Sequence, residues 1–142
     1  MASGDDFHPP FSLERIDHVL LLVDGMDDAV AFYERTLGAV VESRLPHYGM
    51  AELRVGTSHL DLVDTSDPQG AWARPPAAGG RNMDHVAIRA DAPDEAAVRA
   101  HLAAHRVEIV EERIEETTDG KNLSFYVRDP SGNTVELMTR CQ

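Results

Sequence analysis

One phrase occurs twice in this chain of 142 residues. Ile16-Asp17-His18-Val19 opens an apolar stretch in the first half, and Met83-Asp84-His85-Val86 opens another in the second half. Each stretch leads into a helical pattern and then into strand patterns. Each half closes on a carboxylate set between apolar residues, Leu60-Asp61-Leu62 and Val135-Glu136-Leu137. A long period with two copies indicates a duplicated module rather than a solenoid.

The periodicity of each half predicts the order βαβββ, which places the chain in the α+β class. In the first module, residues 14–64, we expect strands at 16–23, 39–45, 51–55 and 58–64. The helix between the first two strands is expected over Asp27–Leu37, because apolar residues fall at helical spacing and Gly38 is suited to ending it.

The second module, residues 83–142, repeats this plan with strands expected at 83–90, 107–113, 122–128 and 133–139. Asp91 is a candidate cap for a helix that runs to about His105. The acidic stretch Glu111–Lys121 is predicted to be a loop, and Asp129-Pro130-Ser131-Gly132-Asn133 a turn. The proline- and glycine-rich residues 65–82 are expected to link the modules, and residues 1–13 to form a flexible arm.

Composition restricts the classes of function. The net charge is −12, from 13 basic and 25 acidic residues, which argues against binding nucleic acid or anionic membranes. No apolar run is long enough for a membrane span, and the first residues do not resemble a secretory signal, so we expect a cytoplasmic protein. With Cys141 as the only cysteine, neither an internal disulfide nor a thiolate metal cluster can form.

The repeated residues themselves indicate a metal site. A carboxylate in an apolar strand is costly to bury unless it is paired or binds a cation, and Asp61 and Glu136 both have apolar neighbours. His18 and His85 stand near the starts of two buried strands. Two imidazoles with one or two carboxylates suit a divalent iron, nickel, zinc, manganese or cobalt ion, with positions left for water or substrate.

These motifs resemble the vicinal oxygen chelate superfamily, which includes glyoxalase I, extradiol dioxygenases, methylmalonyl-CoA epimerase and the fosfomycin and bleomycin resistance proteins. The resemblance covers about Ile16 to Met138. Besides the histidine phrases, it is carried by Ala31-Phe32-Tyr33 with Leu37-Gly38, and by the stretch from Ser124 to Asn133 that leads to Val135-Glu136-Leu137. It implies that the paired modules curve into an incomplete barrel around a metal.

The resemblance also implies roles for individual residues. His18, His85 and Glu136 match metal ligands of the family. Asp61 stands where the lyases and epimerases have glutamate or glutamine. Because aspartate is one methylene shorter, we expect a ligand, a water-mediated ligand, a base, or a side chain that only bonds to a neighbouring residue. His59 is expected to face the same cavity as a ligand, a neighbour of a ligand or an acid/base. The hydroxyl of Tyr126 is a candidate hydrogen-bond donor to a metal-bound oxygen.

Two kinds of activity remain open from these residues. The first is a metal-dependent enzyme acting on a small oxygen-bearing molecule, either as a lyase or isomerase of the glyoxalase type or as an extradiol-type dioxygenase. The second is a metal-free protein that sequesters a drug or metabolite, as in bleomycin resistance. A fosfomycin thiol transferase ranks below both, because no potassium loop or phosphonate cluster is recognisable. The resemblance implies a homodimer, with the site either within one chain or across two.

Overall fold

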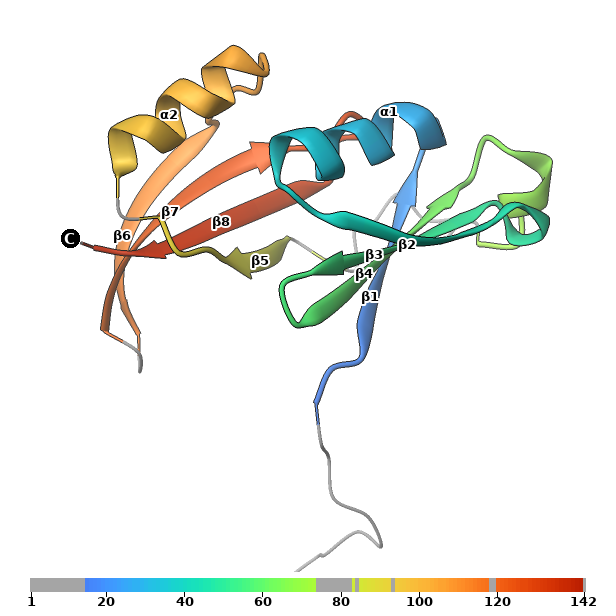
Figure 1. The fold of residues 1–142 in the computed structure, drawn as a ribbon, viewed down its shortest axis with the longest axis horizontal. Coiled ribbons are helices and arrows are strands. Elements are labelled where there is room, and N and C mark those ends of the chain that lie inside the picture. Colours follow the sequence, from blue (N-terminus) through green and yellow to red (C-terminus); the bar gives the residue numbers. More distant parts are fainter. Residues whose placement is uncertain (1–14, 74–82, 84, 93, 118–119, 142) are drawn as a thin grey trace, which may run out of the picture.

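The computed structural model describes residues 15–73, 83, 85–92, 94–117 and 120–141. The predicted arm at 1–13 and the part of the predicted linker at 74–82 lie outside the described residues. Two four-stranded sheets lie side by side, with both helices along one side of the molecule (Figure 1). Among the described residues, no helix has the length and apolar character needed to span a bilayer.

The two sheets have the same topology. The first has the order β1-β4-β3-β2, in which β1 (His18–Val23) runs parallel to β4 (Ser58–Asp64), while β3 (Met50–Val55) and β2 (Val40–Leu45) complete an antiparallel meander. The second has the order β5-β8-β7-β6. Its strands are β5 (Val86–Arg89), β6 (Glu111–Thr117), β7 (Gly120–Arg128) and β8 (Thr134–Arg140). The predicted duplication and the α+β class are confirmed.

The helix of the first module follows the prediction closely. It consists of α1 (Met26–Ala31) and a π-helical turn, η1 (Phe32–Thr36). The chain leaves it at Gly38, whose φ of 77° lies in the left-handed region that favours glycine. In the predicted linker, a 3-10 turn, η3 (Pro68–Gly70), is capped by Asp67, and a second such turn, η2 (Pro46–Tyr48), connects β2 to β3.

The helix of the second module, α2 (Glu95–Ala104), starts later than predicted. Its cap is Asp94, whose carboxylate accepts a hydrogen bond from the backbone N–H of Ala97 at 3.1 Å. The prediction that Asp91 caps this helix is therefore wrong. An N-cap acceptor must stand two or three residues before the N–H that it satisfies, and Asp94 occupies that position.

Part of the strand prediction in the second module is also wrong. The expected strand at 107–113 begins only at Glu111, and the predicted acidic loop Glu111–Lys121 contains β6 and the start of β7. Strand β6 is an edge strand that pairs antiparallel with β7, and Arg113 makes ion pairs with Glu111 and Glu115 on its surface. Pairing with a buried neighbour outweighed the weak strand preference of this charged sequence, and charge along an exposed edge protects a sheet from further pairing.

Strand alternation divides each sheet into an apolar face and a polar one. Toward the helices, the first sheet contributes Leu21, Leu53 and Leu62, all at most 1% exposed, and these pack with Tyr33 of η1. The second sheet adds Val127 and Val135, with Leu102 of α2, to the same core. The opposite faces carry most of the histidines and carboxylates singled out above. We call them the open faces of the two sheets.

Hydrogen bonds join the two modules on the helix side. The buried Tyr33 hydroxyl donates to Asp129 Oδ2 at 2.8 Å, and Asn133 Nδ2 donates to the Leu22 carbonyl at 2.8 Å. Asp129 also accepts the backbone N–H groups of Ser131 and Asn133, which forms the predicted turn. His101 Nε2 of α2 lies 2.7 Å from the carbonyl of Thr36. These contacts fix the orientation of the two sheets within one chain.

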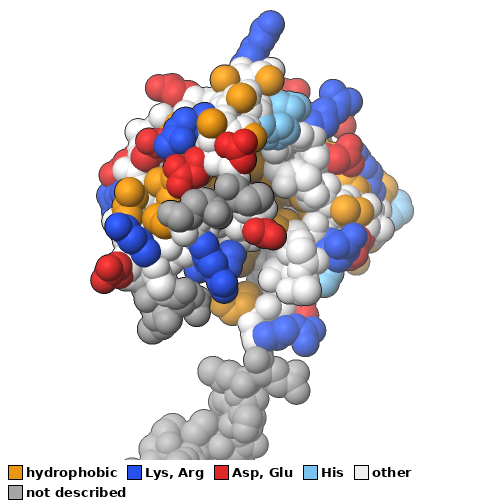
Figure 2. Space-filling view, turned by 60° about the vertical axis from the view of Figure 1, so that its left-hand side comes forward, with side chains coloured by type: hydrophobic (Ala, Val, Ile, Leu, Met, Phe, Trp, Pro, Cys, Tyr) orange, Lys and Arg blue, Asp and Glu red, His pale blue; other side chains and the backbone are white. Residues whose placement is uncertain are grey.

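Several ion pairs lie on the side of the molecule that contains α2 and β6. Acidic and basic side chains are interspersed with hydrophobic ones on that side (Figure 2). Arg99 of α2, for example, pairs with Glu112 at 3.0 Å and with Glu95 at 3.8 Å. Such exposed pairs contribute little stability each, so the apolar core and the hydrogen bonds between the modules carry most of it.

A candidate metal centre in two halves

The first half of the candidate site is on the open face of the first sheet. Parallel pairing sets His18 beside His59 and Leu20 beside Asp61, so His18, His59 and Asp61 share this face. Asp61 is 7% exposed, and its Oδ2 lies 3.7 Å from Nε2 of His18. We call His18 and Asp61 the first half-site.

Both members of the first half-site have a shifted pKa. Burial raises the pKa of the Asp61 carboxyl, and the neighbouring His18 opposes this shift only in part. The pKa of His18 is raised by its hydrogen bond to Asp17 and by the charge of Asp61. The site thus holds a carboxylate that is more basic than usual beside an imidazole that retains a proton more readily than usual.

The second half-site, His85 and Glu136, is built in the same way. Glu136 of β8 pairs with Ala87 of β5, and His85 precedes Ala87 by two residues, so both side chains are on the open face. Glu136 is 5% exposed, and its Oε2 lies 3.1 Å from Nε2 of His85. Strand β7, which pairs with β8 on the side away from β5, supplies Tyr126 directly opposite Glu136.

Tyr126 holds the carboxylate of Glu136 rather than standing free. Its hydroxyl donates to Oε1 of Glu136 at 2.8 Å, and its ring packs edge-on against His85 with centroids 5.6 Å apart. The guanidinium of Arg113 lies 5.4 Å above the same ring. Burial and the bond to Glu136 raise the pKa of Tyr126 to about 12. The phenol therefore stays protonated near neutral pH and acts as a donor.

Each half-site offers the nitrogen and oxygen atoms that divalent metals bind. Metal–nitrogen and metal–oxygen bonds of about 2.1 Å place adjacent ligand atoms about 3.0–3.5 Å apart. The separations of 3.1 Å and 3.7 Å are close to this range. Among the described residues, neither buried carboxylate forms an ion pair with lysine or arginine. Two buried anions without such a partner fit a cation.

The two half-sites do not meet within the chain. No group of three or more His, Cys, Asp or Glu side chains in the described part could hold a metal ion. A cavity of about 720 Å³ between β1, β4 and β5 is lined by His59 and His85, but not by His18, Asp61 or Glu136. The expected barrel thus stays incomplete, and one chain by itself presents two pairs of donors rather than one set of four.

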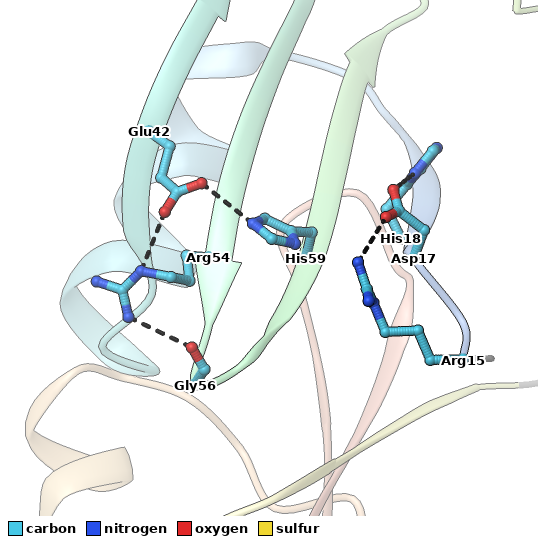
Figure 3. A network of polar contacts seen from close by, with 7 residues as sticks. All are labelled: Arg15, Asp17, His18, Glu42, Arg54, Gly56 and His59. Atoms are coloured by element: carbon cyan, nitrogen blue, oxygen red, sulfur yellow. Dashed lines mark hydrogen bonds and ion pairs between the residues drawn. The ribbon is translucent and has the colours of Figure 1, made fainter.

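His59 is on the open face, but its ring is directed to another partner. Its Nε2 lies 3.1 Å from Oε2 of Glu42, and Arg54 Nε donates to Oε1 of the same carboxylate at 3.0 Å (Figure 3). The role predicted for His59 remains a prediction, and its Nδ1 is the atom that could serve it. Glu42 was missed from the sequence, because a bulge in β2 shifts its pairing between Val41 and Ser43.

Sequence reasoning also missed Glu52 and Asp17. Glu52 is directly opposite Asp61 in β3, and its charge contributes to the raised pKa values of both Asp61 and His18. The alternation Ala51-Glu52-Leu53-Arg54 could have placed it on the open face. Asp17 Oδ2 lies 2.9 Å from Nδ1 of His18, and its presence in the repeated phrase was the available signal.

Comparison with known proteins identifies the family. The model of the Glyoxalase/Bleomycin resistance protein/Dioxygenase superfamily matches residues 15–137. The chain belongs to this superfamily. The resemblance inferred from the motifs is thereby confirmed, and the superfamily commonly binds divalent metals.

The chain is also similar to individual members of the superfamily, in sequence or in fold. The chain is 30% identical to the mitochondrial methylmalonyl-CoA epimerase of Bos taurus, over 96% of this chain and 81% of the epimerase. Its fold matches the crystal structure of a lactoylglutathione lyase from Agrobacterium tumefaciens with a TM-score of 0.63 and 25% identity, over 92% of this chain and 96% of the lyase. The fosfomycin resistance protein FosX of Mesorhizobium loti shares the fold, with a TM-score of 0.65 and 15% identity over 92% and 95% of the chains.

Proposed function

We propose that this protein is a divalent-metal-dependent isomerase or lyase whose metal site is assembled from two chains. The observation that carries the proposal is the pair of matched half-sites. Each sets a histidine Nε2 within 4 Å of a buried carboxylate oxygen, and in the described residues neither half-site has a third ligand. Four donors require that the halves be brought together.

A symmetric dimer supplies this arrangement. In a two-fold dimer, the open face of the first sheet of one chain meets the open face of the second sheet of its partner, and the reverse contact forms at the same time. The interface then contains two equal sites, each with His18 and Asp61 from one chain and His85 and Glu136 from the other. The expected homodimer thus also explains why a single chain leaves both sheets open.

The donor set favours proton transfer over oxygen chemistry. Iron oxygenases typically use two histidines and one carboxylate, whereas the two half-sites together offer two histidines and two carboxylates. Burial raises the pKa of Asp61, which suits a group that accepts a proton from carbon. The hydroxyl of Tyr126 is bonded to Glu136, so it is not free to orient a bound oxygen. A dioxygenase is therefore the second candidate.

Each residue of the two half-sites has a separate role in the proposed reaction. A divalent ion, when bound, would act as a Lewis acid on a substrate carbonyl and make the adjacent C–H bond more acidic. Asp61 would take the proton from that carbon and return it to the opposite face or to a neighbouring carbon, so that atoms and charge balance over one turnover. His18, His85, Glu136 and, between turnovers, Asp61 would hold the ion, and Tyr126 would fix the carboxylate of Glu136.

The buried carboxylates also argue against the sequestering alternative. A protein that only encloses a drug gains nothing from two buried acids that have no lysine or arginine partner among the described residues, and burying them without a cation lowers its stability. Metal-free binding therefore ranks below the enzyme.

Two measurements test the proposal. Plasma mass spectrometry of protein purified without chelator should find about one divalent metal per chain, lost in a His85→Ala/Glu136→Ala variant. Solvent deuterium should then exchange into a probe with an acidic C–H, and methylmalonyl-CoA, the compound in the epimerase's name, is the first to try. Failure to bind any first-row metal, even after incubation with each ion, would overturn the proposal in favour of sequestration.

A further inference from the structure

The imidazole of His18 lies between two carboxylates. Its Nδ1 is 2.9 Å from Oδ2 of Asp17, and its Nε2 is 3.7 Å from Oδ2 of Asp61. Asp17 itself is held on its other oxygen by Arg15, 3.5 Å away (Figure 3). Only the contact to Asp17 is within hydrogen-bonding distance, so the two ring nitrogens of His18 are not equivalent.

This asymmetry decides which nitrogen carries the proton in the neutral ring. A carboxylate accepts hydrogen bonds but cannot donate them when ionised. The nitrogen that faces Asp17 must therefore bear the hydrogen, which leaves a lone pair on Nε2 toward Asp61. A metal-binding histidine needs this arrangement, because one nitrogen donates to an acceptor while the other binds the ion.

We infer that Asp17 is a positioning residue for the metal site: its carboxylate holds His18 in the Nδ1-protonated tautomer and aims Nε2 at the ion. The metal-positioning role of Asp17 rests on the proposed function. The tautomer of His18, in contrast, is a property of the metal-free protein and can be measured there. Without Asp17, the nearest carboxylate is Asp61, which would draw the hydrogen to Nε2 and occupy the nitrogen that should bind the metal.

The first test measures the tautomer directly. In metal-free protein labelled with ¹⁵N-histidine at pH 9, two-bond ¹H–¹⁵N spectra separate a protonated ring nitrogen from an unprotonated one, and a His18→Gln spectrum assigns the signals. Wild-type His18 should show a protonated Nδ1, and Asp17→Ala should shift it toward a protonated Nε2. An Nε2-protonated His18 in the wild type, or a tautomer unchanged in Asp17→Ala, would overturn the inference.

The second test measures Zn²⁺ affinity by competition with a chromophoric chelator at pH 7.5. Loss of an outer partner of a ligating histidine typically weakens metal binding about 10- to 100-fold, and we expect this loss in Asp17→Ala. Asp27→Ala is the matched control, since the side chain of Asp27 is fully exposed at 4.0 Å from Arg44 and its removal changes the net charge equally. Equal Zn²⁺ affinity of Asp17→Ala and Asp27→Ala would contradict the inference.

The two tests separate this inference from the proposed function. If the wild type binds no metal, the proposed function fails, while the tautomer spectra still decide what Asp17 does to His18. If the wild type binds Zn²⁺ and Asp17→Ala binds it equally well, the metal site stands and the positioning role of Asp17 is wrong.

Discussion

Tyr126 and Glu136 stand opposite one another on adjacent strands, and the tyrosine hydroxyl donates to one carboxylate oxygen at 2.8 Å. The other oxygen of Glu136 lies 3.1 Å from His85. One atom of this carboxylate is thus fixed by the protein, and the other is directed into the second half-site. Asp17 and His18 show the same arrangement in the first half-site, so each half-site contains a proposed ligand held by a residue outside the proposed ligand set.

Replacing Tyr126 with Phe tests this arrangement. Removal of the hydroxyl frees Oε1 of Glu136 and leaves a buried carboxylate with one fewer donor. We expect Zn²⁺ affinity to fall about 10-fold or more and the free energy of unfolding to fall by about 1–3 kcal/mol. Chelator competition and urea unfolding measure the two effects. Tyr48→Phe, at an exposed tyrosine in η2, is the control and should change neither.

Asp61→Asn should stabilise the metal-free protein while preventing metal binding. Because burial raises the pKa of Asp61, its ionised form costs stability in the folded state, and this cost grows as the pH rises through the ordinary aspartate pKa of about 4. At pH 8 the variant should melt on the order of 2 °C above the wild type. Near pH 3 the two should coincide. A lower melting temperature for Asp61→Asn at pH 8 would show that Asp61 is a structural residue.

Tyr33→Phe tests the connection between the modules. The Tyr33 hydroxyl is buried and donates to Asp129 across the modules. Its loss should lower the free energy of unfolding by about 2 kcal/mol, because hydrogen bonds to charged groups are stronger than neutral ones. Urea denaturation measures this, and Tyr48→Phe should stay within about 0.5 kcal/mol of the wild type. An equally small effect for Tyr33→Phe would mean that this hydrogen bond contributes little to holding the modules together.

Asp64 should account for part of the acid sensitivity of the fold. Burial opposes its ionisation, but hydrogen bonds from Ser66, Gly25 and Met26 outweigh burial and hold its pKa below the usual value. Ionised Asp64 therefore stabilises the fold above pH 4, and this contribution is lost as the pH falls through its lowered pKa. Asp64→Asn should be less stable than the wild type at pH 7, and the difference should shrink toward pH 2. A difference independent of pH would assign the effect to packing.

The helices and strands that depend on periodicity and short motifs could be predicted from the sequence. Strand β4 matches its predicted range, and the first helix and Gly38 fall where the pattern placed them. The sequence could not predict β6, since Glu111–Thr117 becomes a strand only by pairing with β7. Nor could it show that His59 is bonded to Glu42, because a contact between β2 and β4 depends on how both strands pair with β3.

If two chains complete one metal site, a mixed dimer shows it most directly. A chain with His18→Ala/Asp61→Ala and a chain with His85→Ala/Glu136→Ala each lack one half-site. When they are co-expressed with two different tags that bind no metal, the purified heterodimer contains one intact site and one empty site if the sites span both chains. We predict about one metal per heterodimer and none in either mutant homodimer. A heterodimer without metal, beside a wild type that binds it, would contradict the account.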